Sequence, residues 1–255
     1  MNKTIIATCS ALVMLFLLHS CAVDKVDSDS RPIKHDLFTE ILQEYVDSNG
    51  MVDYGRLQQD SAKFNVYLDL LSENHPNDKH WTKSEQLAYW INAYNAFTLQ
   101  LIVRNYPITS IKDITPVTLP FVVSPWDVKF INIEGREYDL NQIEHGIIRA
   151  QFDQPMIHFG LVCAAKGCPK LRTEAYTAEE VDAQLAEQAS DFVNDQMKNL
   201  TGSPNPKVSK IFRWYKGDFT DSSSLAEYLN SISDDSIASD ADIDYLDYNW
   251  ELNAQ

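Results

Sequence analysis

The residues best suited to chemistry lie in the middle of the chain. Glu144 and His145 are adjacent, and His158 and Cys163 follow soon after them. A histidine oriented by a carboxylate can act as a general base, and a thiolate beside an imidazole can act as a nucleophile. One interpretation is therefore a catalytic group made of these four residues. The other is a polar helix face whose histidine is hydrogen-bonded for structural reasons.

The cysteine pair at Cys163 and Cys168 has competing interpretations. In an exported protein two such cysteines form a disulfide by default, and this bridge would remove the nucleophilic thiol. A zinc site that also uses His145 and His158 has suitable ligand types, but the spacing of the cysteines does not fit the usual zinc motifs. We predict a Cys163–Cys168 disulfide, with no metal and no cofactor.

Five further side chains are candidates for binding. Asn92 and Asn95 are three residues apart and share one helix face, where buried amides need partners from a loop or a ligand. Arg149 lies one turn beyond the histidine of the Glu-His pair. Lys166 and Arg172 flank the cysteine pair and would form a small positive area in an acidic protein. We predict these five as binding residues.

Apolar residues at helical spacing and capping-box motifs predict the helices that position these side chains. The expected helices cover 37–45 and 57–71, begin near Thr82, Asp139 and Thr177, and cover 224–232.

Alternating or continuous apolar runs predict strands at 128–133, 156–162, 208–214 and 243–250. A strand over 156–162 would place His158 and Cys163 on opposite faces. The expected fold is a single α+β domain in which helices pack on a mainly antiparallel sheet.

The N-terminus has the features of an export signal. One lysine precedes a short apolar run, and the sequence Leu18-His19-Ser20-Cys21 resembles a bacterial lipobox. We predict a signal peptide over 1–20, a lipid on Cys21 and a flexible, acidic tether over 21–32. Ala22 after the cysteine resembles the signal that directs lipoproteins to an outer membrane, on its periplasmic or surface face. The expected partner is the membrane, through this lipid anchor.

The composition supports a folded, acidic protein. The chain has 255 residues, is 44% hydrophobic and carries a formal net charge of −16, with 37 acidic against 21 basic residues. Nucleic acid requires a positively charged surface, so it is excluded as a partner. The apolar content is too high for a disordered chain.

Five segments together resemble the family called domain of unknown function 547. They are 90–96 (WINAYNA), 143–149 (IEHGIIR), 158–169 (HFGLVCAAKGCP), 211–215 (IFRWY) and 243–253 (IDYLDYNWELN). The resemblance implies a domain over 80–253, preceded by a helical part over 33–79. The family has no assigned activity, so the resemblance implies no reaction.

Two functional hypotheses follow. In the first, a non-catalytic domain of the cell envelope binds a peptide or a glycan. In the second, the domain is a hydrolase or transferase with His145 as the base and a cysteine or water as the nucleophile. The order of helices and strands is loosely similar to that of papain-like and transglutaminase-like enzymes, but no cysteine begins the aromatic helix where those enzymes carry their nucleophile.

Overall fold

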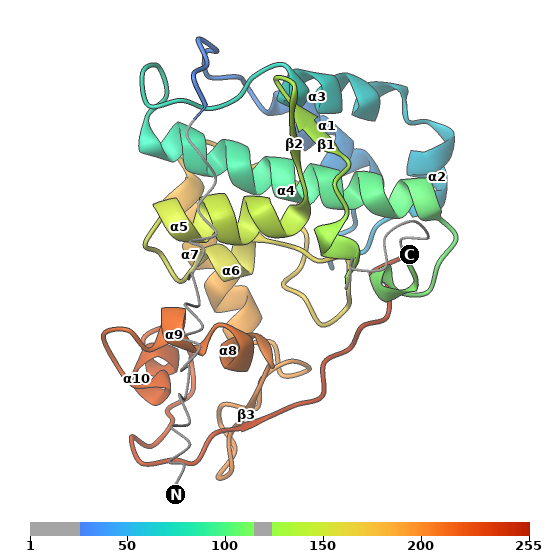
Figure 1. Ribbon diagram of the computed structural model, residues 1–255. Coiled ribbons are helices and arrows are strands. Elements are labelled where there is room, and N and C mark those ends of the chain that lie inside the picture. Colours follow the sequence, from blue (N-terminus) through green and yellow to red (C-terminus); the bar gives the residue numbers. More distant parts are fainter. Residues whose placement is uncertain (1–25, 115–123) are drawn as a thin grey trace, which may run out of the picture.

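Helices dominate the protein, which we describe from a computed structural model covering residues 26–114 and 124–255. The predicted signal peptide and Cys21 lie outside the described residues. Figure 1 shows the long helix α4 crossing the upper half of the molecule, with α1 and α3 above it, α2 near its right-hand end and α8 to α10 at the opposite, lower end. None of the helices in the described part of the chain combines the length and the apolar character that a membrane span requires.

The helical elements include several short ones and one π-helix. The longer helices are α1 (Asp36–Tyr45), α2 (Tyr54–Gln59), α3 (Ala62–Ser72), α4 (Lys83–Asn105), α7 (Val181–Val193) and α10 (Leu225–Asn230). The short α-helices are α5 (Arg149–Gln151), α6 (Ile157–Gly160), α8 (Ile211–Trp214) and α9 (Lys216–Phe219). Two 3-10 turns, η1 (Ile111–Asp113) and η2 (Pro125–Asp127), and the π-helix η3 (Gln142–Ile148) complete the set.

The mixed α+β class is confirmed, but the expected sheet is wrong. The described residues form two small sheets: an antiparallel hairpin of β1 (Ile131–Ile133) with β2 (Arg136–Tyr138), and a parallel pair of β3 (Lys207–Val208) with β4 (Asp244–Tyr245). Helices therefore pack mainly on one another, because pairs this short offer too little surface to cover.

Three of the predicted strands are wrong over most of their length, because the structure has short helices or irregular segments there. The segment 156–162 contains the helix α6, since a short buried apolar run has the same appearance in a helix and in a strand. Of 208–214, only the first residue belongs to β3, and the rest leads into α8. Of 243–250, only two residues form β4.

The helix α4 is the scaffold of the fold. Thr82 accepts a hydrogen bond from the backbone of Glu85, and Glu85 accepts one from the backbone of Thr82, so the predicted capping box is confirmed. Nearly all of the helix is buried, because apolar clusters cover it on every side. The amides of this helix can therefore reach loops that are distant in sequence.

The C-terminal segment packs against the helical part near the start of the described chain. The backbone of Val52 donates a hydrogen bond to the Asn253 carbonyl (2.8 Å), and Tyr54 donates one to the Asn253 side chain (2.7 Å). Helices α1 to α3 share one apolar cluster with α4. The helical part predicted over 33–79 is thus packed directly against the rest.

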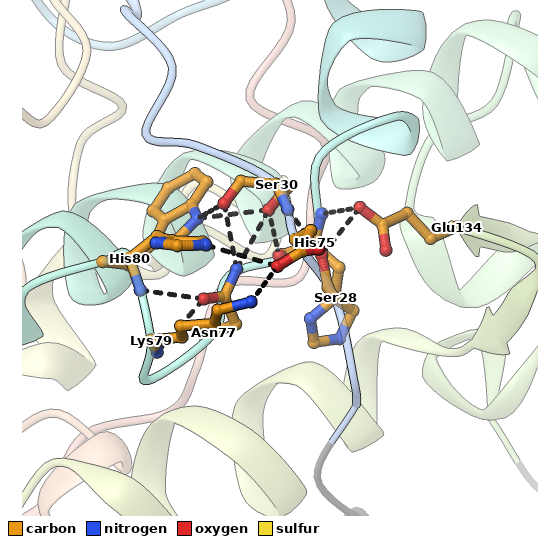
Figure 2. Close-up of polar contacts among 9 residues, drawn as sticks. Ser28, Ser30, His75, Asn77, Lys79, His80 and Glu134 are labelled. Atoms are coloured by element: carbon orange, nitrogen blue, oxygen red, sulfur yellow. Dashed lines mark hydrogen bonds and ion pairs between the residues drawn. The ribbon is translucent and has the colours of Figure 1, made fainter.

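Part of the segment predicted as a tether also lies on the fold. Figure 2 shows Ser28 and Ser30 among side chains of the loop before α4 and of the β1–β2 hairpin. Ser28 donates a hydrogen bond to Glu134 (3.0 Å), and the Ser30 carbonyl accepts hydrogen bonds from Asn77 (3.0 Å) and Trp81 (3.1 Å). From Ser28 onward the segment is therefore held by specific contacts, and the tether before Val26 lies outside the described residues.

Candidate functional site

A pocket of about 220 Å³ lies where several distant segments meet. We call it the aromatic pocket, because most of its large lining side chains are aromatic. Its lining residues are Tyr94, Trp126, Asn141, Glu144, His158, Leu161, Cys163, Cys168, Pro169, Ile211, Trp214, Tyr215, Tyr248 and Trp250. Each of the five segments that carry the family resemblance contributes at least one of them.

The aromatic rings at one side of the pocket contact each other. The ring of Tyr248 lies 4.8 Å from that of Trp214 and 4.7 Å from that of Trp250, measured between centroids, and Trp126 lies 5.9 Å from Trp250. Trp214 is 47% exposed. An apolar body with a polar edge suits these rings to ligands that present both kinds of surface.

Glu144 supplies a polar group inside the pocket. Its side chain is buried and accepts a hydrogen bond of 2.5 Å from the Tyr215 hydroxyl, and Tyr94 is hydrogen-bonded to it as well. Burial, and next the charge of Glu144, raise the pKa of both tyrosines. Both hydroxyls therefore stay protonated and act as donors, so Glu144 is fixed in position.

The backbone around Glu144 differs from the expected α-helix. Asp139 and Gln142 cap the start reciprocally, as the sequence predicts, through bonds of 2.7 and 3.2 Å. The next turns form a π-helix instead. Such turns shift the side-chain directions relative to a regular helix and are frequent at functional sites.

His158 forms part of the wall of the same pocket. Its Nε2 atom lies 2.7 Å from Asp218 Oδ2, and its ring stacks on Tyr215 at 3.8 Å between centroids. Burial lowers the pKa of His158, although the hydrogen bond with Asp218 opposes this effect. The expectation that His158 and Cys163 face opposite sides is wrong, because the segment is helical and both residues line the pocket.

Asp218 links this histidine to the other one. It accepts two hydrogen bonds of 2.7 Å from Arg149, and another Arg149 nitrogen lies 3.0 Å from His145 Nδ1. The bonds from His158 and Arg149 lower the pKa of Asp218, so it is ionised at neutral pH. Sequence reasoning missed Asp218, because its role depends on contacts of α9 with Arg149 of α5 and His158 of α6.

His145 lies in a different place from the residues it was expected to join. It lines a second, polar pocket of about 520 Å³ together with Arg149 and Asp218, and we call this the polar pocket. Its Nδ1 atom is 4.0 Å from Glu144 Oε1, beyond hydrogen-bond distance. Because arginine can only donate, Nδ1 acts as an acceptor toward Arg149. The pairing of His145 with Glu144 or Cys163 is therefore not formed.

The predicted disulfide is confirmed. Cys163 and Cys168 are joined, with their Cα atoms 6.2 Å apart. The loop between them is paired with the C-terminal segment, since Lys166 donates to the Glu251 carbonyl (2.8 Å) and Gly167 to that of Asn249 (2.9 Å). A Cβ on Gly167 would lie 2.9 Å from that same Asn249 carbonyl, so a side chain there would push the segments apart. In this state neither Cys163 nor Cys168 is a free thiol that could act as a nucleophile.

The two asparagines of α4 serve the fold and not the pocket. Asn92 exchanges two hydrogen bonds with the backbone of Tyr176, at 2.8 and 2.9 Å. Asn95 donates to the Gly160 carbonyl and accepts from the Val162 amide, both at 2.9 Å. Both amides are buried. From the sequence, each of them is expected to bond either a loop or a ligand, and both bond the backbone of segments distant in sequence.

The two predicted cations are paired with carboxylates. Lys166 contacts Glu251 at 2.9 Å, and Arg172 contacts Glu187 at 2.6 Å and also Glu174. The positive area expected beside the cysteines is therefore neutralised, and neither side chain lines the aromatic pocket.

Comparison with known proteins agrees with the sequence resemblance. Residues 79–193 match the model of a family described as "Protein of unknown function, DUF547". The chain resembles this family. Neither the curated proteins nor the solved structures include a match. The DUF547 match contains three of the five segments, those with Tyr94, with Glu144 and with His158 and the disulfide, whereas Trp214 and Trp250 lie beyond it.

Proposed function

We propose that this protein is a binding domain of the cell envelope and that the aromatic pocket takes a glycan. The observation that carries this proposal is the convergence of five sequence segments on one pocket with a fixed acceptor at Glu144 and exposed rings at its side. Pockets with apolar walls and a few oriented polar groups are typical ligand sites.

A glycan fits this chemistry better than a peptide. Sugar rings have apolar faces that can lie on Trp214 and Trp250, and their hydroxyls can donate to Glu144. Extended peptides usually bind along an exposed strand, and no residue of β1 to β4 lines this pocket. The net charge of −16 disfavours anionic ligands.

The test is a fluorescence titration, which uses the tryptophans of the pocket as reporters. Oligomers of N-acetylglucosamine and, separately, a set of short peptides serve as probes. Glycan binding should be at least tenfold weaker in Trp250→Ala and in Glu144→Gln, on the scale of a lost central contact. The exposed Val66→Ala provides the control and should bind as the unchanged protein does. If only the peptides bind saturably, the ligand is a peptide and not a glycan. If glycan binding is equally strong in both pocket variants, the aromatic pocket is not the binding site.

A second candidate function rests on the hydrogen bond between His158 and Asp218. A carboxylate that holds an imidazole in the wall of a pocket can help it accept a proton from water. With both cysteines in the disulfide, water is the nucleophile in this version of the hydrolase hypothesis. The base is then His158 and not His145. The distant likeness to papain-like and transglutaminase-like enzymes stays an expectation from sequence alone.

Hydrolysis and binding can be separated by one pair of variants. If the pocket is catalytic, release of soluble fragments from isolated cell-wall glycan should disappear in His158→Gln, while glycan binding persists. His145→Gln is the matched control, because it changes a histidine of the polar pocket. Equal loss of release in both variants would argue against a specific role of His158.

We also propose that the chain is exported and anchored by a lipid on Cys21, at a bacterial outer membrane. The apolar N-terminal run and the lipobox-like sequence support this proposal. Metabolic labelling with a fatty acid should mark the unchanged protein and not Cys21→Ser. Labelling that persists in the variant would contradict it.

A further inference from the structure

The disulfide is part of the wall of the aromatic pocket, and its two cysteines differ in exposure. Cys163 is partly exposed, whereas Cys168 is 2% exposed. Of the two residues, Cys163 is therefore the more open to a molecule that enters the pocket. Thiol–disulfide exchange depends on such access and on which sulfur is attacked.

Cys168 Sγ has two hydrogen-bond donors, whereas Cys163 Sγ has only one of them, the Tyr248 hydroxyl. The backbone N–H of Cys163 donates to Cys168 Sγ at 3.1 Å, and the Tyr248 hydroxyl donates to the same atom at 3.3 Å. The Tyr248 hydroxyl is also 3.4 Å from Cys163 Sγ, so it lies between the two sulfurs. Burial, and next the charge of Glu144, raise the pKa of Tyr248, which keeps its proton available for donation.

These donors matter when the bond breaks. A thiolate that leaves is stabilised by nearby N–H and O–H groups, and a better leaving group departs faster. Cys168 is thus prepared as a leaving group, and Cys163 is placed as the atom to be attacked. A disulfide with a purely structural role needs neither feature.

We propose that the Cys163–Cys168 disulfide is a site of thiol exchange with a thiol-bearing molecule that enters the aromatic pocket. The incoming thiolate forms a bond with Cys163 Sγ while the Sγ–Sγ bond breaks, and the electron pair leaves on Cys168. A second thiolate then bonds to the sulfur of the bound molecule and releases Cys163. Two thiols are thereby oxidised to a disulfide, and their two protons pass to Cys163 and Cys168.

The fold is arranged to tolerate this exchange. The loop between the cysteines is held by backbone bonds that do not involve the sulfurs, from Lys166 to Glu251, from Gly167 to Asn249 and from Asn253 to Ala164. Opening the disulfide therefore leaves the loop attached to the C-terminal segment. The proposal is independent of the glycan proposal, because a glycan carries no thiol.

Reduction of the folded protein tests the exchange. The whole chain is treated with reduced glutathione or dithiothreitol, alkylated, digested and analysed by mass spectrometry for the peptides with Cys163 and Cys168. We expect reduction at a rate that is independent of urea below the unfolding transition. A rate that rises steeply with urea and vanishes in its absence would show that only the unfolded chain reacts, and it would overturn the proposal.

Variants then test the two sulfurs separately. Tyr248→Phe should slow reduction roughly tenfold, since one donor to the leaving sulfur is lost. Tyr245→Phe is the matched control and should react at the unchanged rate. In Cys168→Ser, oxidised glutathione should attach to Cys163 at least about tenfold faster than it attaches to Cys168 in Cys163→Ser, because Cys163 is the more exposed of the two. Equal rates for these two cysteine variants, or an unchanged rate in Tyr248→Phe, would contradict the assigned roles.

Discussion

The aromatic pocket and the polar pocket lie on either side of the hydrogen bonds that join Arg149, Asp218 and His158, yet different kinds of side chain line them. The aromatic pocket has rings, a disulfide and a buried carboxyl group with tyrosine donors. The polar pocket has His145, Arg149 and several acidic side chains. Asp218 contributes to the polar pocket and binds His158 in the wall of the aromatic one.

The two histidines have different surroundings, and this difference decides which of them suits base catalysis. His158 is buried and held by a carboxylate, whereas His145 is partly exposed and faces a guanidinium. A carboxylate can hold an imidazole in the orientation that proton transfer needs, and a guanidinium, which only donates hydrogen bonds, cannot accept a proton from it. The histidine that looked better suited to base catalysis from sequence is therefore the less suited one in the structure.

The largest effect should come from removing the residue that both sides share. Asp218→Ala leaves Arg149 and the buried His158 without their common partner, and it should lower the free energy of unfolding by about 2–4 kcal/mol. Chemical denaturation measures this loss. The nearby exposed Asp221→Ala is the control, and an equal effect of both variants would show that the two pockets are not joined through Asp218.

A smaller effect is expected from Arg149→Lys. The change keeps the charge but loses the paired geometry toward Asp218, and it should cost about 1–2 kcal/mol of stability. Because the aromatic pocket does not use Arg149, glycan binding should change little. A loss of binding as large as in Glu144→Gln would contradict the separation of the pockets.

The dependence of folding stability on pH should reveal the contribution of His158, the histidine in the wall of the aromatic pocket. The pKa of His158 is lowered in the folded state, so the unfolded chain takes up its proton first as the pH falls below about 6.5. The contribution of the neutral histidine is therefore complete above this pH and is lost as the pH falls toward the folded-state pKa. Denaturation curves between pH 7 and pH 5 should show a weaker pH dependence in His158→Gln. An unchanged slope would mean that His158 does not contribute.

The smallest effect is expected at the surface beside the cysteines. Lys166→Ala removes an exposed ion pair with Glu251 and should leave the free energy of unfolding almost unchanged. Thermal unfolding at low and high salt measures it. A larger loss would show that the side chain of Lys166, and not only its backbone, holds the cysteine loop.

Sequence patterns predicted the elements whose signals are local. The capping box at Thr82 and the helix from Ser224 are both present, because each depends on neighbours in the chain. The predicted disulfide is also present. The segment with His158 was misjudged, because a buried apolar run does not distinguish a helix from a strand.

The candidate site was predicted in part. Glu144, His158 and Cys163 were named from the sequence and do meet in one pocket, whereas Asn92 and His145 do not join them. Asp218 and the tryptophan ring cluster carried no local signal for a site. What could have indicated part of the cluster is that Trp214 and Trp250 belong to two of the five segments that carry the family resemblance, whereas Trp126 belongs to none.

The sequence by itself determined the acidic character, the family resemblance, the ends of several helices and the presence of a disulfide. These follow from composition and from contacts between residues close in the chain. The tertiary structure decided which histidine contacts a carboxylate, because Asp218 is 60 residues from His158. It also decided which side chain contacts the disulfide, because Tyr248 is 80 residues from Cys168. Contacts over such separations arise from the packing of whole elements, and no local spacing rule describes them.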